Sequence, residues 1–149
     1  MKIITGNIFN QPTKHDKTEA ICVTTNGMIK SNGHAVMGRG IALAVNNRYH
    51  VSLELAKHIR QHGNVPGIIG CSDDVYIISF PTKDDWRNDS DIKLIEQSAR
   101  HIVSLANEYG LTNIYLTKPG CANGHLDWNN VRSVIEPILD DRFTIVDIT

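Results

Sequence analysis

The chain has 149 residues, of which 41% are hydrophobic and 21% charged, and it carries a net charge of −1 at pH 7. This length predicts one domain, spanning residues 1–149, with enough apolar side chains for a core of its own. The nearly neutral charge excludes a general polyanion-binding surface, so any contact with nucleic acid has to be local. No apolar stretch approaches the roughly 20 residues that cross a bilayer, and no charged-then-apolar leader opens the chain.

The cysteines give no sign of a disulfide framework or a metal site. Cys22, Cys71 and Cys121 are odd in number and lie far apart, which is typical of reduced thiols in a cytoplasmic protein. The sequence also lacks the P-loop pattern G-x-x-x-x-G-K-[ST] and the dinucleotide-binding pattern G-x-G-x-x-G. We therefore expect a cytoplasmic protein that uses no metal and no cofactor.

The first half of the chain predicts two strands, two helices and a third strand, in that order. Short β-prone runs occupy residues 2–5 and 20–25. Residues 38–49 and 51–62 carry apolar side chains at helical spacing. A further apolar run at residues 67–71 indicates a strand.

The second half alternates between strands and helices. Residues 75–80 predict a strand, and residues 91–109 repeat apolar side chains about every 3.6 positions, which predicts the longest helix. A strand is expected at residues 114–116, a helix at 128–139 and a last strand at 143–148. The order β-β-α-α-β-β-α-β-α-β predicts a layered α/β domain in which helices cover a mixed sheet.

Two predicted loops between a strand and a helix are rich in glycine. Residues 25–40 read TNGMIKSNGHAVMGRG, and residues 118–128 read KPGCANGHLDW. Glycines let the backbone approach a ligand closely, and free N–H groups at the start of a helix attract an anion. Each loop alone is better explained as a tight turn, but the pair predicts a cradle for a diphosphate. A side chain at Gly38 or Gly120 is expected to block this cradle without lowering the melting temperature.

The stretch SFPTKDDWR, residues 79–87, places a lysine among two acids, a tryptophan and an arginine at the end of a predicted strand. Taken alone, Lys83 is best explained as a solvated lysine. The alternative is a lysine positioned for chemistry on a ligand that the two glycine-rich loops hold.

Four stretches of the chain together resemble the macrodomain family. They are TGNIF at residues 5–9, TTN with AVMGRGIA at 24–26 and 35–42, FPTKDDWR at 80–87, and PGCANGHLDW at 119–128. The resemblance covers essentially the whole chain and is greatest to the branch of DNA ADP-ribosyl glycohydrolase antitoxins and terminal ADP-ribose glycohydrolases. It implies a three-layer α/β/α sandwich with a central mixed sheet. For a chain of this size we expect a phage or bacterial source.

The resemblance also implies ligand-binding positions. Asn7 stands where the family has an acid that accepts a hydrogen bond from the adenine amino group, and its amide oxygen can still accept. Adenine selectivity is therefore expected to be looser. Asn26 matches the asparagine that holds the distal ribose, with Asn32 as a competing alignment because the following loop is longer. The other implied ligand-binding residues are Ile8, Val36, Met37, Gly38, Arg39, Gly40, Gly120, Cys121, Ala122, Asn123 and Gly124.

By the same resemblance, Lys83 is the catalytic residue and acts on the distal ribose. A neutral amine could attack the opened sugar as a Schiff-base nucleophile, or the lysine could assist the leaving group electrostatically. Attack requires a lowered pKa, which burial or a cation such as Arg87 favours and which Asp84 and Asp85 oppose. In terminal ADP-ribose glycohydrolases an aspartate in the second loop assists the lysine. Gly124 takes its place here, as in the DNA-directed antitoxins.

Several neighbouring side chains receive structural interpretations. Trp86 and Arg87 are expected to brace their loop and not to touch substrate. Asp127 precedes the last predicted helix and is expected to cap it. Cys121 has no paired base in the sequence and is expected to pack.

The histidines are weaker candidates. His58 and His62 have the spacing of two zinc ligands on a helix, but no glutamate lies between them and no third ligand is evident. We expect them on a solvated face. His34 and His125 lie in the two glycine-rich loops and are expected to be polar surface, with phosphate contact or an acid role as the alternative.

These features predict a macrodomain that removes ADP-ribose from a modified macromolecule, with DNA the favoured target. One alternative is a phosphatase that acts on ADP-ribose 1″-phosphate. Another is a non-catalytic reader that binds ADP-ribose or a related nucleotide. The protein is expected to act as a monomer, away from membranes.

Overall fold

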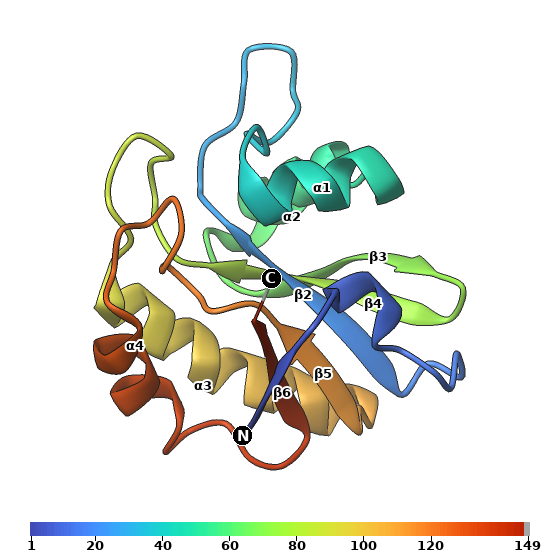
Figure 1. The fold of residues 1–149 in the computed structure, drawn as a ribbon. Coiled ribbons are helices and arrows are strands. Elements are labelled where there is room, and N and C mark those ends of the chain that lie inside the picture. Colours follow the sequence, from blue (N-terminus) through green and yellow to red (C-terminus); the bar gives the residue numbers. More distant parts are fainter. Residues whose placement is uncertain (148–149) are drawn as a thin grey trace.

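The computed structural model describes residues 1–147 and shows a sheet between two layers of helices (Figure 1). In this part of the chain the strands are β1 (Lys2–Thr5), β2 (Glu19–Thr25), β3 (Gly67–Ser72), β4 (Val75–Pro81), β5 (Asn113–Leu116) and β6 (Phe143–Asp147). The α-helices are α1 (Gly40–Tyr49), α2 (Ser52–His62), α3 (Ile92–Tyr109) and α4 (Trp128–Ile135), and a short 3-10 helix, η1, spans Ile8–Asn10. None of these helices is long and apolar enough to cross a membrane.

The sheet is mixed, in the order β1-β6-β5-β2-β4-β3. Strand β3 runs antiparallel to β4, and the other neighbours are parallel. Because five of the six strands share a direction, the loops that follow them gather at one edge of the sheet. The predicted mixed sheet covered by helices is confirmed.

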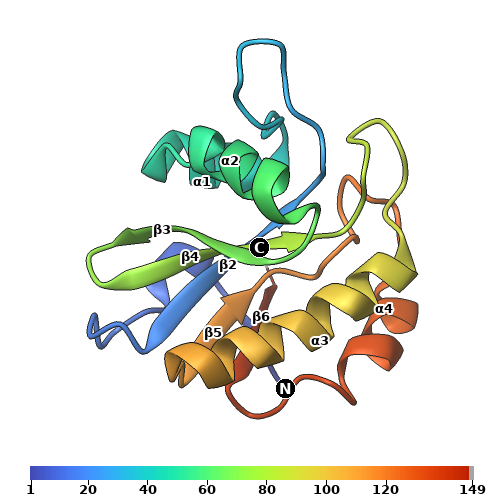
Figure 2. The ribbon, with the colours of Figure 1, turned by 180° about the vertical axis from the view of Figure 1, so that it is seen from behind.

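The core is divided by the sheet into two halves, and strand β2 contributes to both. Ala20 and Cys22 pack in the cluster that contains the buried faces of α3 and α4. Ile21 and Val23 pack in the cluster that contains α1 and α2. Since successive side chains of a strand point to opposite faces, a continuous apolar strand buries both of its faces. Figure 2 shows the same division from behind, with α1 and α2 on one side of the sheet and α3 and α4 on the other.

Two predicted boundaries differ from the structure by more than one residue. The last helix was expected over residues 128–139, but α4 ends at Ile135. Pro137 has no N–H group to continue the helical hydrogen bonds, so the chain leaves the helix in a turn. The helix expected from residue 38 begins at Gly40, because Arg39 is extended, with φ −142° and ψ 152°. Residue 148 of the last predicted strand lies outside the described residues.

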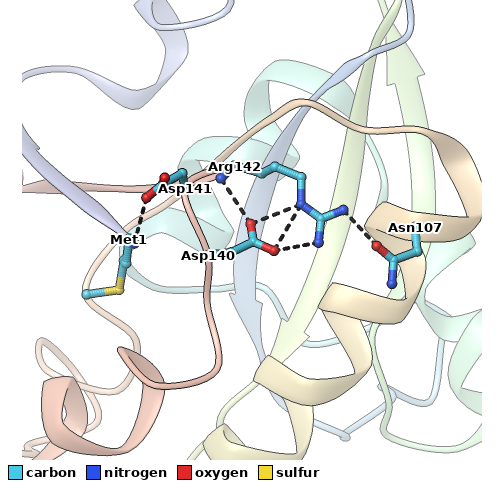
Figure 3. A network of polar contacts seen from close by, with 5 residues as sticks. All are labelled: Met1, Asn107, Asp140, Asp141 and Arg142. Atoms are coloured by element: carbon cyan, nitrogen blue, oxygen red, sulfur yellow. Dashed lines mark hydrogen bonds and ion pairs between the residues drawn. The ribbon is translucent and has the colours of Figure 1, made fainter.

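The start of β6 is tied to α3 and to the first residue by polar contacts (Figure 3). The Arg142 guanidinium donates to both carboxylate oxygens of Asp140, at 2.7 to 3.2 Å, and to Asn107 Oδ1 at 2.8 Å. The amino group of Met1 lies 4.0 Å from Asp141 Oδ1. These contacts hold the turn before β6, and with it the two neighbouring strands β6 and β1.

Candidate functional site

A cleft of about 1040 Å³ opens at the carboxyl ends of the parallel strands. Residues that follow β1, β2, β4 and β5 line it, together with the last residues of β6. Ligands of open α/β sheets usually bind at this edge, and the volume suits a ligand at the large end of the usual range. Figures 1 and 2 both show the loop after β4 and the loop after β5 side by side beyond the sheet.

The structure brings every residue to which the sequence assigned a ligand-binding or catalytic role into the wall of this cleft. They are Asn7, Ile8, Asn26, Val36, Met37, Gly38, Arg39, Gly40, Lys83, Gly120, Cys121, Ala122, Asn123 and Gly124. Asn32, the competing alignment to Asn26, lies at the exposed tip of the first loop, away from the cleft wall. That the wall residues contact a ligand stays a prediction.

Asn26 closes the base of the first glycine-rich loop. Its Nδ2 donates to the carbonyl of Val36 at 3.0 Å, and its Oδ1 accepts from the N–H of Met28 at 2.9 Å. The amide therefore holds the two ends of the loop at the mouth of the cleft. One N–H of Nδ2 remains for a ligand.

The two glycine-rich loops meet at the start of α1. Gly40 has a φ of 54°, and a Cβ there would lie 2.9 Å from Asn123 Nδ2, so a side chain at this position would be strained and would push Asn123 away. Arg39, the residue before the helix, makes no side-chain hydrogen bond to the first N–H groups of α1. These N–H groups carry the positive end of the helix dipole and lie at the cleft.

The second loop packs tightly against Ser90. A side chain at Gly124 would clash with Ser90 Oγ and lie 2.5 Å from the carbonyl oxygen of Gly120. The position therefore has no room for the aspartate that assists the lysine in terminal ADP-ribose glycohydrolases. Cys121 contacts the carbonyl of Pro119, and burial raises the pKa of its thiol. A raised thiol pKa disfavours a nucleophile and agrees with the packing role predicted from the sequence.

Lys83 connects the two loops that follow β4 and β5. Its Nζ donates to the carbonyl of Asn88 at 3.0 Å and to the carbonyl of Asn123 at 3.3 Å. The side chain is half-buried in the cleft wall. Burial lowers the pKa of the Lys83 ammonium below its ordinary value; the carboxylate of Asp89 acts against this, and the cation of Arg39 acts with it. Lys83 is therefore not a freely solvated surface lysine.

The neighbouring acids act differently from the expectation. Asp85 is paired with Arg87 at 2.6 Å, and that hydrogen bond lowers the pKa of Asp85 to about 2. Asp84 accepts from Asn64 Nδ2 at 2.8 Å, and the same nitrogen donates to the carbonyl of Lys83 at 3.1 Å. The acid that raises the pKa of Lys83 is Asp89, two residues beyond the predicted motif.

Trp86 packs against two arginines, as a residue that braces its loop would, and it also lies at the cleft; that it does not touch substrate stays a prediction. Its side chain lines the cleft and 39% of it is exposed. The guanidinium carbons of Arg39 and Arg87 lie 5.4 and 5.9 Å from the ring centroid. Packing with Arg39 is a contact between two loops far apart in the sequence, which the local pattern could not reveal.

At the opposite end of the cleft, Asn7 is already engaged. Its Oδ1 accepts from the N–H of Phe9 at 2.9 Å and so caps η1. The acid at this end is Asp147 on β6, which pairs with Lys118 at 3.0 Å, and both residues line the cleft. The oxygen of Asn7 is thus less available to an amino group than the sequence suggested.

Sequence reasoning missed several other residues of the cleft wall. Thr25 Oγ1 and Ser90 Oγ are buried and have no hydrogen-bond partner among the described residues. Thr25 was recognisable as the last residue of a strand that leads into a glycine-rich loop. Asp147 gave no signal, and Lys118 was marked only as the first residue of the second glycine-rich loop, because their pairing joins segments that are distant in the sequence.

The histidines lie outside the cleft wall. His34 Nδ1 contacts Ser52 Oγ at 2.7 Å, and His125 is exposed in the second loop. His58 Nε2 contacts the carbonyl of Val65 at 2.8 Å and its ring lies against that of His62, with centroids 5.0 Å apart. Within residues 1–147, no group of three potential ligands is arranged to hold a metal.

Comparison with known proteins places the chain among macrodomains. Residues 30–135 match the Macro domain family. The chain is 27% identical to a DNA ADP-ribosyl glycohydrolase of Thermus aquaticus, covering 94% of this chain and 38% of that protein. It is 30% identical to the DNA ADP-ribosyl glycohydrolase of Mycobacterium tuberculosis, covering 76% of this chain and 33% of that protein. The chain thus spans about a third of the length of these curated relatives.

Solved structures agree over nearly the whole chain. The macrodomain of Mycobacterium tuberculosis DarG has a TM-score of 0.76 and 26% identity, covering 99% of this chain and 98% of that one. The macrodomain of Thermus aquaticus DarG has a TM-score of 0.76 and 25% identity, covering 99% of this chain and 97% of that one. Thermosipho africanus DarTG in complex with ADP-ribose shares the fold, with a TM-score of 0.77 at 23% identity over 99% of this chain and 42% of that one. From the family match and the shared fold, the chain belongs to the macrodomain family.

Proposed function

We propose that this protein binds ADP-ribose in the cleft and hydrolyses the bond that joins ADP-ribose to a modified macromolecule, with DNA the favoured target. Two curated relatives are described as DNA ADP-ribosyl glycohydrolases, and a structure of the same fold is described as a complex with ADP-ribose. The observation that carries the proposal is the half-buried amine of Lys83, held in the cleft wall by carbonyls of two loops.

The cleft offers a place for the diphosphate where the two glycine-rich loops meet. The uncapped start of α1 supplies backbone N–H groups there, and Asn123 touches Gly40 from the second loop. A phosphate held at this point would leave the distal ribose near Lys83, because the carbonyl of Asn123 accepts from Lys83 Nζ. The adenine then extends toward Asn7 and Asp147 at the other end of the cleft.

The hydrogen bonds of Lys83 can be made by the neutral amine as well as by the ammonium. A neutral Nζ has two N–H groups and one lone pair, and the structure provides two carbonyl acceptors. With both N–H groups engaged, the lone pair is left for attack. The lowered pKa of Lys83 raises the fraction of the side chain in this form.

In the proposed reaction, Nζ attacks C1″ of the distal ribose and the bond from C1″ to the target breaks. One amine proton leaves with the target and the other goes to O4″ of the opened ring, so that an imine joins Nζ to C1″. One water then hydrolyses the imine, which restores the amine and releases free ADP-ribose. The alternative role of Lys83 is electrostatic assistance to the departing group, without a covalent intermediate.

Lys83→Ala is the test. It should abolish release of ADP-ribose from ADP-ribosylated DNA and leave the Kd for ADP-ribose within about threefold of wild type, the pattern of an interaction made in the transition state. Lys57→Ala, on the exposed surface of α2, is the matched control. A fully active Lys83→Ala variant would contradict the proposal.

Two further measurements define the role of the lysine. Lys83→Arg should not restore turnover, because a guanidinium stays protonated. Borohydride added during turnover should reduce the imine and attach ADP-ribose covalently to Lys83 in the wild type. An active Lys83→Arg variant would leave only the electrostatic role. Release of inorganic phosphate from ADP-ribose 1″-phosphate would indicate a phosphatase instead. Binding of ADP-ribose without formation of any product would indicate a non-catalytic reader.

A further inference from the structure

Trp86 is an exposed aromatic side chain at the reacting end of the cleft. Among the large hydrophobic side chains exposed in residues 1–147, it is the one that lines the cleft. It belongs to the loop whose Asn88 carbonyl accepts from Lys83 Nζ at 3.0 Å. A group that leaves C1″ of a ribose at Lys83 therefore departs beside this loop.

The indole is accompanied by guanidinium groups. Arg39 Cζ lies 5.4 Å from the centroid of the Trp86 ring, and Arg39 is exposed without an acidic partner among the described residues. Arg87, on the other hand, is fixed by its pair with Asp85 at 2.6 Å. Aromatic rings and the planes of arginine side chains are the two surfaces on which proteins stack unpaired nucleobases.

We propose that Trp86 and Arg39 form a stacking platform for the nucleobase to which ADP-ribose is attached. The inference rests on the proposed function, because it needs the distal ribose at Lys83. It adds that the target is a planar base and not an aliphatic protein side chain. The base must also lie outside a duplex, since a paired base offers no free face beside the cleft.

The local charges favour stacking over attraction of phosphates. Two arginines and three acids belong to the platform and its loop: Arg39, Arg87, Asp84, Asp85 and Asp89, with Lys83 beside them. Their charges sum to −1 when Lys83 is neutral and to zero when it is protonated, so in either form this mouth of the cleft has no excess positive charge to attract a polyanion. Binding of a modified oligonucleotide should therefore depend weakly on salt, unlike binding through several phosphate contacts.

Binding is tested in the Lys83→Ala background, where turnover cannot consume the ligand. Three ligands are compared: free ADP-ribose, a single-stranded oligonucleotide ADP-ribosylated on one base, and a peptide ADP-ribosylated on glutamate. The oligonucleotide should bind about tenfold more tightly than free ADP-ribose, which corresponds to ~1.4 kcal/mol. Trp86→Leu should remove this gain and leave the affinity for ADP-ribose within about twofold, whereas Trp86→Phe should keep most of it.

The outcomes separate the platform from the ADP-ribose site. Normal ADP-ribose binding with no gain from the attached base overturns the platform and leaves the proposed function intact. An equal loss of affinity for all three ligands in Trp86→Leu would show that Trp86 supports the structure of the cleft wall, and it would also overturn the platform. A gain for the peptide as large as that for the oligonucleotide would exclude selection of a base. Absence of binding to ADP-ribose in the wild type would instead overturn the proposed function.

Discussion

Valine substitutions at Gly38 and Gly120 should affect stability differently: the first should impair only ligand binding, and the second should also lower the free energy of unfolding. A Cβ at Gly38 would meet no atom within 4 Å, and the residue is exposed in the cleft wall. Gly38→Val should therefore change the free energy of unfolding by less than about 0.5 kcal/mol. Its side chain should nevertheless occupy space in the cradle where the diphosphate is proposed to lie, and ADP-ribose binding should be lost.

Gly120 differs because its surroundings are filled. Its φ is 76°, and a Cβ would lie 2.8 Å from Ile95 Cδ1 and 3.0 Å from Ser90 Cβ. The left-handed backbone costs a side chain about 1–2 kcal/mol, and overpacking adds about 1–3 kcal/mol. A total of about 2–5 kcal/mol lowers the melting temperature of a chain of this size by about 4–20 °C. The sequence-based expectation of an unchanged melting temperature is therefore revised for Gly120.

Thermal unfolding without ligand and calorimetric titration with ADP-ribose test this pair. Wild type should bind ADP-ribose with roughly micromolar Kd, about −8 kcal/mol, and AMP much more weakly. If Gly120→Val has the same melting temperature as the wild type, the second loop is not packed against α3 as described. If Gly38→Val binds ADP-ribose normally, the first loop does not contact the ligand.

Two further predictions concern titratable groups. If Lys83 attacks as a neutral amine, kcat/KM should rise with pH to a plateau, with a midpoint below the ordinary lysine pKa of about 10.4. Arg39→Gln should move this midpoint up and Asp89→Asn should move it down; a flat profile, or shifts of the same sign, would contradict the assignment. Arg142→Ala should lower the free energy of unfolding at pH 7 by about 1 kcal/mol without affecting ADP-ribose binding, measured by urea unfolding. Since the hydrogen bond from Arg142 lowers the pKa of Asp140, this contribution should disappear as the pH falls below the folded pKa, and equal stability of the two proteins at pH 7 would contradict it.

The sequence predicted the positions of strands and helices well because each is marked locally. The Asp91 cap and Gly110 mark the two ends of α3, and Asp127 caps α4 as expected. The end of α4 was misplaced because apolar residues continue beyond Ile135, while Pro137 interrupts the hydrogen bonds. The pattern of side-chain types therefore predicts the presence of a helix or strand more reliably than the residues at which that helix or strand begins and ends.

The candidate site was predictable as a set of residues but not as a set of contacts. Gly38 and Gly120 look alike in the sequence, yet only Gly120 packs against Ile95 and Ser90 from another part of the chain. The exposure of Trp86 likewise depends on partners that the surrounding residues do not specify. The conformation and the environment of a loop residue depend on its tertiary contacts. The roles of these loop residues could therefore be assigned only from the structure.

The pairing of β1 with β6 has a consequence for when the cleft can form. Lys2–Thr5 are synthesised long before Phe143–Asp147, which is their only strand partner among the described residues. The wall that contains Asn7 and Asp147 therefore cannot form until β6 has been synthesised. The central pairs of β2 with β4 and β5 can assemble earlier, around the loops that hold Lys83 and Asn123. A nascent chain should thus build the part of the cleft around Lys83 before the part around Asn7, and acquire full affinity for its ligand only after β6 has been synthesised.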